Sequence, residues 1–134
     1  MVIESIAGLP AFLLYFVVGS LLVALYLVAY SFVTAHDELA LIRRNIPAAA
    51  IALGLSLLGF ALPLSSAIIN SVSIIDCVIW GVIALLVQIA TYLAVRLLIP
   101  DLSTRIEANE MAAALFVGAA SLAAGALNAA SMSY

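Results

Sequence analysis

The chain has 134 residues, of which 68% are apolar and 8% are charged, and its formal net charge is −3. Soluble proteins carry roughly 25% charged residues, and a small soluble domain leaves too much surface wet to hide so many apolar side chains. The composition therefore excludes a water-soluble domain. The acidic balance, without any lysine, also argues against a nucleic-acid partner.

Four stretches lack Asp, Glu, Lys and Arg: residues 5–36, 45–75, 77–95 and 111–134. Each reaches, or falls one residue short of, the roughly 20 residues that cross a hydrocarbon core about 30 Å thick. We predict an all-α integral membrane protein with one domain, residues 1–134, embedded in the lipid bilayer. Its four transmembrane helices are expected over about 9–33, 47–70, 75–99 and 110–132.

The second half of the chain repeats part of the first at an offset of 64 residues. The matching residues are Asp37, Ile42, Asn45, Ala48, Ala49, Ala50 and Gly54, which correspond to Asp101, Ile106, Asn109, Ala112, Ala113, Ala114 and Gly118. We predict two repeats, over about 9–72 and 75–134, each with two helices. Because each repeat crosses the membrane twice, both insert the same way round, as a parallel repeat.

Residues 1–8 are expected to form a short tail before the first helix. A stripe on that helix, made of Tyr15, Gly19, Leu22, Tyr26 and Tyr30, recurs at spacings of three and four. It is read as a packing face, with a tyrosine-lined pathway as the alternative.

The first connection, residues 34–44, contains the adjacent residues His36, Asp37 and Glu38. A metal site needs several convergent His or Cys ligands, and this chain has one histidine and one cysteine, far apart in the sequence. We therefore expect a solvated turn at the membrane surface, with no metal and no other cofactor.

The second helix carries small residues at spacings that allow membrane helices to approach closely. The predicted packing residues are Ala48, Ala52, Gly54, Ser56 and Gly59. Pro63 lies inside the helix and removes a backbone hydrogen bond, so it predicts a kink. The adjacent hydroxyls of Ser65 and Ser66 can satisfy the freed carbonyls. The segment is read as a packing bend, with a gate as the alternative.

The third helix places Gln88 near the middle of the bilayer, where an unpaired amide costs a few kcal/mol. Gln88 must therefore face protein or water, either as an interhelical contact or as a pore-lining group. The fourth helix, rich in alanine and glycine, offers a second packing face through Ala114, Gly118, Ser121 and Gly125. A candidate intramembrane polar site combines the following residues: Ser65, Ser66, Asn70, Gln88, Tyr92 and Asn128.

All four arginines, Arg43, Arg44, Arg96 and Arg105, fall on one side of the predicted membrane layout. The positive-inside rule then places both connections in the cytoplasm and both termini outside. The connections display Asp37, Arg43, Arg44, Arg96, Asp101 and Arg105 as candidate contacts for a protein partner.

Several segments resemble the YjfL-type bacterial inner-membrane proteins, a domain-of-unknown-function family (number 350). They are GFALPLSSAIINSVS at residues 59–73, Trp80-Gly81, Gln88, Arg96 followed by Pro100, and Gly125 with Asn128-Ala129-Ala130. The resemblance spans nearly the whole chain. It implies a bacterial inner-membrane protein of four helices with the two-helix unit in duplicate, and it suggests a partner-binding role linked to the cell envelope.

Two functions remain after an enzyme is set aside. No nucleophile has a base in reach, because Ser65 and Ser66 lie on the side of the membrane opposite His36, and Cys77 has no basic partner. The two small-residue faces and the two similar connections favour a homo-oligomeric membrane scaffold that binds a partner. The alternative is an oligomeric ion or small-solute channel with its pore between subunits, because a four-helix bundle fills its own centre.

Overall fold

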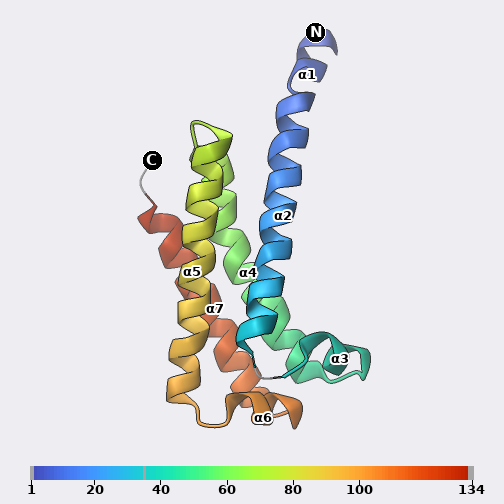
Figure 1. Ribbon diagram of the computed structural model, residues 1–134, viewed down its shortest axis with the longest axis vertical. Coiled ribbons are helices and arrows are strands. Elements are labelled where there is room, and N and C mark those ends of the chain that lie inside the picture. Colours follow the sequence, from blue (N-terminus) through green and yellow to red (C-terminus); the bar gives the residue numbers. More distant parts are fainter. Residues whose placement is uncertain (1, 35, 133–134) are drawn as a thin grey trace.

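The computed structural model describes residues 2–34 and 36–132 as a bundle of helices (Figure 1). The elements are α1 (Val2–Ala7), α2 (Leu9–Val33), α3 (Glu38–Arg43), α4 (Pro47–Asn70), α5 (Ile74–Leu98), α6 (Leu102–Glu107) and α7 (Met111–Ser131). Within the described residues, four helices are long and apolar enough to cross a membrane: α2 together with α1, α4, α5 and α7. The predicted all-helical membrane fold is confirmed. The ends of α2 and α4 are as predicted, and those of α5 and α7 differ by one residue.

The N-terminal segment corrects one prediction, because residues 2–7 form helix α1 where a tail was expected. Gly8 keeps a right-handed helical backbone (φ −81°, ψ −8°), and Phe12 N–H donates to its carbonyl at 3.0 Å. The chain therefore runs from α1 into α2 with little change of direction. Pro10 fits the first turn of α2, where a missing N–H costs nothing.

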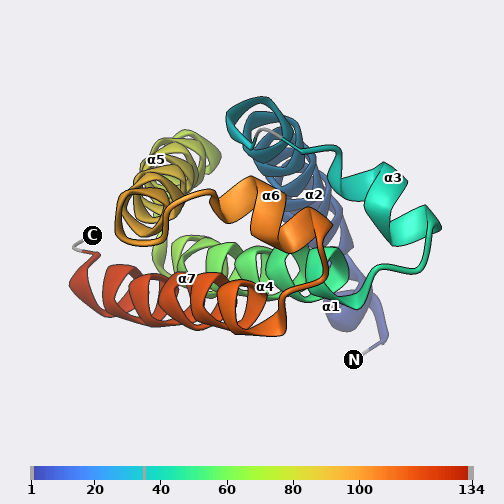
Figure 2. The same ribbon diagram turned by 90° about the horizontal axis from the view of Figure 1, so that it is seen from below.

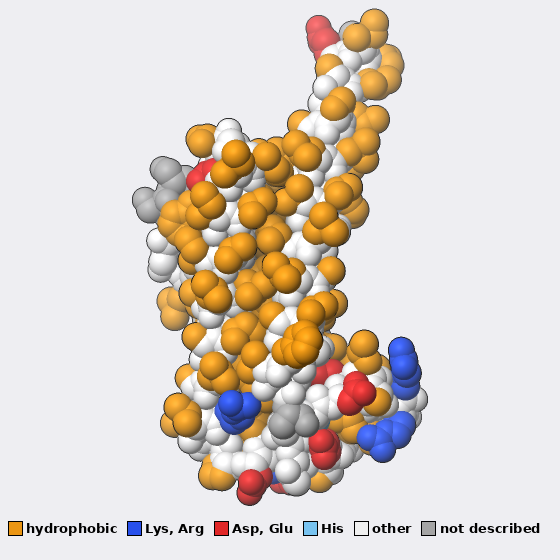
Figure 3. Space-filling view, viewed as in Figure 1, with side chains coloured by type: hydrophobic (Ala, Val, Ile, Leu, Met, Phe, Trp, Pro, Cys, Tyr) orange, Lys and Arg blue, Asp and Glu red, His pale blue; other side chains and the backbone are white. Residues whose placement is uncertain are grey.

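The spanning helices are arranged so that both connections lie at one end of the bundle (Figure 1). The start of α1 and the end of α7 lie at the other end. Seen from below, α4 and α7 run side by side as one layer (Figure 2). The helix α5 and the connection end of α2 lie on one side of this layer. In the space-filling view, apolar side chains cover the shaft, and most of the visible charged side chains gather around α3 and α6 (Figure 3). This distribution suits a shaft in hydrocarbon and two connections in water.

Caps set by the local sequence fix where α3 and α5 begin. Asp37 Oδ1 accepts a hydrogen bond from Ala40 N–H at 3.2 Å and caps α3. Ser73 Oγ accepts one from Asp76 N–H at 3.2 Å and caps α5. Side-chain oxygens at this position satisfy an orphan N–H of the first helical turn.

Candidate functional site

The contact between α4 and α7 is the most extensive one between the described helices, and two glycines bring the backbones together. A Cβ atom added at Gly59 would collide with the carbonyl oxygen of Ser121, and one added at Gly125 would collide with the carbonyl oxygen of Gly59. Pro63, four residues after Gly59, has no N–H to donate to that same carbonyl. The Gly59 carbonyl instead lies against the Cα of Gly125, where a weak Cα–H···O contact suits it.

Most of the predicted packing residues lie in this contact, which we call the α4–α7 seam. The buried members are Ala48, Ala52, Ser56 and Gly59 on α4, with Ala114, Gly118, Ser121 and Gly125 on α7. The Ser56 and Ser121 hydroxyls hydrogen-bond across the seam at 3.2 Å. A neutral hydrogen bond of this kind between membrane helices contributes about 0.6 kcal/mol.

Gly54, also predicted as a packing residue, lies outside the seam. It is exposed, and a Cβ there would meet nothing within 4 Å in the described chain. Gly54 lies two positions before Ser56, about 200° away around the helix, so the two point to different sides of α4. A packing role for Gly54 therefore stays a prediction, and its partner would have to come from outside the described chain.

Gln88 joins the seam to α5. Its side chain is fully buried, and Nε2 donates to the Ser121 carbonyl at 3.0 Å. This contact favours the interhelical reading of Gln88 over the pore-lining one. It also gives α5 a polar anchor in the groove between α4 and α7.

The remaining members of the predicted intramembrane polar site do not converge with Gln88. Ser65 and Asn70 are exposed, and the Asn70 amide bonds locally to the Ser66 carbonyl at 3.0 Å. Ser66 Oγ donates to the Ala129 carbonyl of α7 at 3.4 Å, and Asn128 is half-buried near the same end. Tyr92 is buried towards the opposite end, beside α2. The residues expected to form a single polar site therefore do not come together, because they lie on different faces and at different depths.

The predicted connection residues lie at one end of the bundle. Five of them are exposed, namely Asp37, Arg43, Arg44, Arg96 and Asp101, and Arg105 is half-buried. Arg105 Nε pairs with Glu110 Oε1 at 3.1 Å. Arg96 reaches back to the first half, where Nη1 donates to the Val33 carbonyl at 3.1 Å. The arginines and acids thus offer a mixed-charge surface at this end.

The first connection is not the solvated turn that the sequence predicted. His36 and Glu38 are buried, whereas Asp37 between them is exposed. One signal in the sequence could have found this burial. At the repeat offset Glu38 falls on Leu102, an apolar residue that also points inward.

A protein-family model, "Domain of Unknown Function (DUF350)", matches residues 4–132. The chain belongs to the DUF350 family. The UPF0719 inner membrane protein YjfL of Escherichia coli strain K12 is 46% identical over 127 residues, covering 95% of this chain and 96% of that protein. The protein of the same name from E. coli O157:H7 shows the same identity and coverage. No solved structure matches significantly. Relatives of this kind and four apolar spans identify a multi-pass protein of the bacterial inner membrane, as predicted.

Proposed function

We propose that this DUF350 protein is a non-catalytic, homo-oligomeric membrane scaffold, in which copies meet through the free side of the α4 and α7 layer. The supporting observation is a second set of small residues, which we call the outer stripe, on the exposed faces of these two helices. Its members are Ala50, Gly54 and Ser65 on α4, and Ala119, Ala123, Ala126 and Ala130 on α7.

The outer stripe recurs at spacings of four, three and four on α7, whereas on α4 only Ala50 and Gly54 are four apart and the exposed Leu58 lies between Gly54 and Ser65. Lipid gives no hydrophobic drive for helix association, so small residues matter where another backbone approaches closely. A glycine inside a helix costs about 0.5–1 kcal/mol relative to alanine. Gly54 carries that cost, and nothing in the described chain lies against it. A helix of a second copy would use the space that Gly54 leaves.

The connections supply the partner-binding half of this proposal. The exposed charges on both connections lie at one end of the bundle, which the positive-inside rule places in the cytoplasm with both termini outside. Surface charges of mixed sign favour selective encounter with a complementary protein more than tight binding.

The channel remains the alternative, and the internal polar groups weigh against it. The Ser56 hydroxyl bonds to that of Ser121, and the Gln88 amide donates to the Ser121 carbonyl, in both cases across helices of the same chain. Groups engaged in this way do not line a pore between subunits, where the channel would need them.

Cysteine crosslinking in native membranes tests the scaffold proposal. Cys77 is buried and is the chain's one cysteine, so a Cys77→Ser background gives a clean start. In that background Gly54→Cys should form a crosslinked dimer with a short bis-maleimide, in which each maleimide double bond adds one cysteine thiol. The matched control is Val28→Cys on α2, which is exposed at a similar depth from the connection end and should stay monomeric.

A bulky substitution then tests whether the stripe itself holds the copies together. Gly54→Leu should reduce crosslinking through Ala123→Cys at least tenfold and leave the melting temperature of the single chain unchanged, because its side chain meets open space. Equal crosslinking at Gly54→Cys and Val28→Cys, or none at either, would contradict the scaffold.

A further inference from the structure

The first connection carries a buried ionisable pair that the scaffold proposal does not use. His36 Nε2 and Glu38 Oε1 lie 2.6 Å apart, and their side chains are 0% and 1% exposed. An ionised carboxylate removed from water costs several kcal/mol unless a partner compensates it. The imidazole is that partner, so the two groups act as one unit.

Local structure holds the pair in this inward position. Thr34 Oγ1 donates to the His36 carbonyl at 3.3 Å, and the Asp37 cap starts α3 immediately afterwards. Glu38 and Leu41 then occupy the same side of α3, three residues apart, and both are buried against the bundle. Asp37, between the two residues of the pair in the sequence, stays exposed to water.

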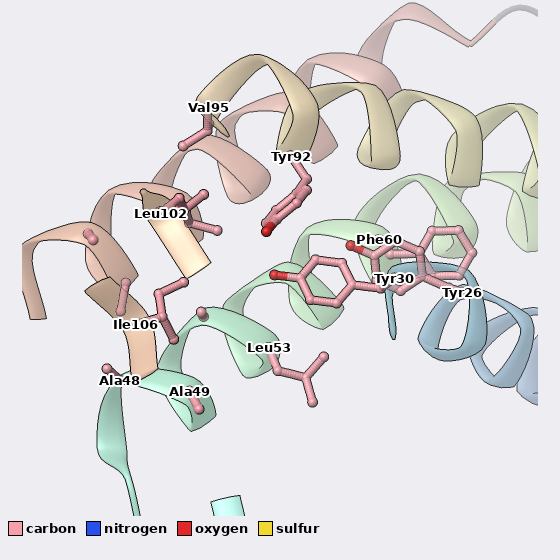
Figure 4. Close-up of a cluster of buried hydrophobic side chains, with 14 of the residues drawn as sticks. Tyr26, Tyr30, Ala48, Ala49, Leu53, Phe60, Tyr92, Val95, Leu102 and Ile106 are labelled. Carbon is pink, nitrogen blue, oxygen red and sulfur yellow. The ribbon is translucent and has the colours of Figure 1, made fainter. Parts of the chain in front are cut away.

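Three buried tyrosines from two spanning helices form a group in the core. The ring centroids of Tyr26 and Tyr30, both on α2, are 5.9 Å apart, and those of Tyr30 and Tyr92 of α5 are 5.2 Å apart. The hydroxyls of Tyr30 and Tyr92 point towards the same space (Figure 4). Glu38 is close enough to interact electrostatically with all three tyrosines.

Other elements packed around this group contribute hydroxyls and one cation. Ser56 of α4 lies beside Tyr26 and Tyr30, and Ser103 of α6 lies beside Tyr92. The Arg96 guanidinium is 5.9 Å from the centre of the Tyr92 ring, but its side chain is exposed and bonds to a backbone carbonyl. Within the described residues, Glu38 pairs with no basic side chain other than His36.

Several polar atoms of this cluster have no hydrogen-bond partner in the described chain. They are His36 Nδ1, Glu38 Oε2, Ser103 Oγ and the hydroxyl oxygens of Tyr26, Tyr30 and Tyr92. Buried polar atoms are normally paired with protein or ordered water. The ring nitrogen, carboxylate and hydroxyl oxygens of this cluster are groups that can accept or donate a proton.

We propose that His36 and Glu38, with the hydroxyls of Tyr30 and Tyr92, form a binding site for a proton that exchanges with water at the connection end. On uptake, a hydronium ion transfers a proton to His36 Nδ1 and leaves as water, while Nε2–H remains bonded to Glu38. The pair then changes from net −1 to net zero, and the tyrosine hydroxyls accept or donate as the charge changes.

The pair lies at the connection end of the bundle, in α3 and the residues just before it. Deeper in the bundle, Ser56 bonds to Ser121 and Gln88 bonds to the Ser121 carbonyl, but no hydrogen bond in the described chain joins these groups to the tyrosine hydroxyls. These deeper contacts end where Gly59 and Gly125 bring the α4 and α7 backbones together. The site therefore binds a proton from the connection end without forming a path across the membrane. It lies within one chain and does not depend on oligomerisation.

His36 is the only histidine in the chain, so its imidazole can be observed alone. The experiment is a pH titration of the full-length protein in detergent micelles, selectively labelled with ¹⁵N-histidine and followed by NMR. Both ring nitrogens should move reversibly between neutral and imidazolium positions across the titrated pH range. Glu38→Gln should lower the proton affinity about tenfold or more, because the neighbouring negative charge is lost.

The matched control is Asp37→Asn, which removes the exposed neighbouring carboxylate and should titrate within about twofold of the wild type. Should Glu38→Gln fail to fold, Tyr92→Phe keeps the ring contact and removes one hydroxyl, and it should change the proton affinity measurably. Imidazole signals that stay fixed across the range would overturn the proposal. So would a Glu38→Gln or Tyr92→Phe titration identical to that of Asp37→Asn.

Discussion

The two connections close with the same backbone turn but bury different chemistry. The helices α3 and α6 each follow an aspartate and end two residues before an asparagine in the left-handed region, Asn45 at φ 63° and Asn109 at φ 62°. The closing hydrogen bonds also match at the offset of 64: Asn45 N–H to Ile42 O and Asn109 N–H to Ile106 O, at 2.9 and 3.0 Å. The matching bonds support the predicted duplication at the connections, which stays a prediction for the spanning helices.

The difference lies in the inward-facing position that follows each aspartate. Glu38 is 2% exposed and its counterpart Leu102 is 1% exposed, so one register position holds a carboxylate in the first half and a leucine in the second. The carboxylate is tolerated because the imidazole of His36 lies 2.6 Å away from it. Local sequence thus determines the path of a connection, and the helices beneath it determine which side chain fits inside.

The largest effect is expected when the second connection receives the buried glutamate of the first at position 102. Leu102→Glu should lower the free energy of unfolding by about 3–5 kcal/mol, because the second connection has no histidine to pair with the buried charge. Leu102→Met keeps the volume and apolar character and should cost less than about 1.5 kcal/mol. Equilibrium unfolding in mixed detergent micelles measures both, and equal losses would contradict this reading.

A smaller effect should separate the two asparagines. An alanine in the left-handed region costs about 1 kcal/mol at either position. Asn109 Oδ1 also accepts from Ala48 N–H at 3.0 Å, at the start of α4, and loss of that bond adds about 1 kcal/mol. We therefore expect about 2 kcal/mol for Asn109→Ala and about 1 kcal/mol for Asn45→Ala in the same unfolding assay. Glycine at each position isolates the side-chain bond, so Asn109→Gly should cost about 1 kcal/mol and Asn45→Gly almost nothing.

The smallest expected contrast is between the two aspartates, and it changes sign. Asp37→Ala removes the cap of α3 and should destabilise the protein by about 1 kcal/mol. Asp101 makes no capping bond and adopts φ 58°, so Asp101→Gly should relax the backbone and raise the unfolding free energy by a few tenths of a kcal/mol. Shifts of the same sign in thermal unfolding would mean that the two turns are built alike.

The sequence by itself determined the spanning helices, because partition into hydrocarbon depends on composition summed over a run of residues. Charged connections and local caps then set the ends of each run to within about a residue. The buried residues of the α4–α7 seam could also be anticipated, since the spacing of small residues is a local property of each helix.

The tertiary structure alone decided which side of each helix meets which neighbour. These helices are apolar all round, so no polar face in the sequence marks the outward direction. For that reason Gly54 points away from the seam, and Ser65 and Asn70 lie apart from Gln88. Burial of His36 and Glu38 likewise depends on tyrosines from α2 and α5 that come together only when the bundle packs. The hydrophobicity of a span is a sum over its own residues, whereas a buried polar pair forms only where segments distant in the sequence pack together.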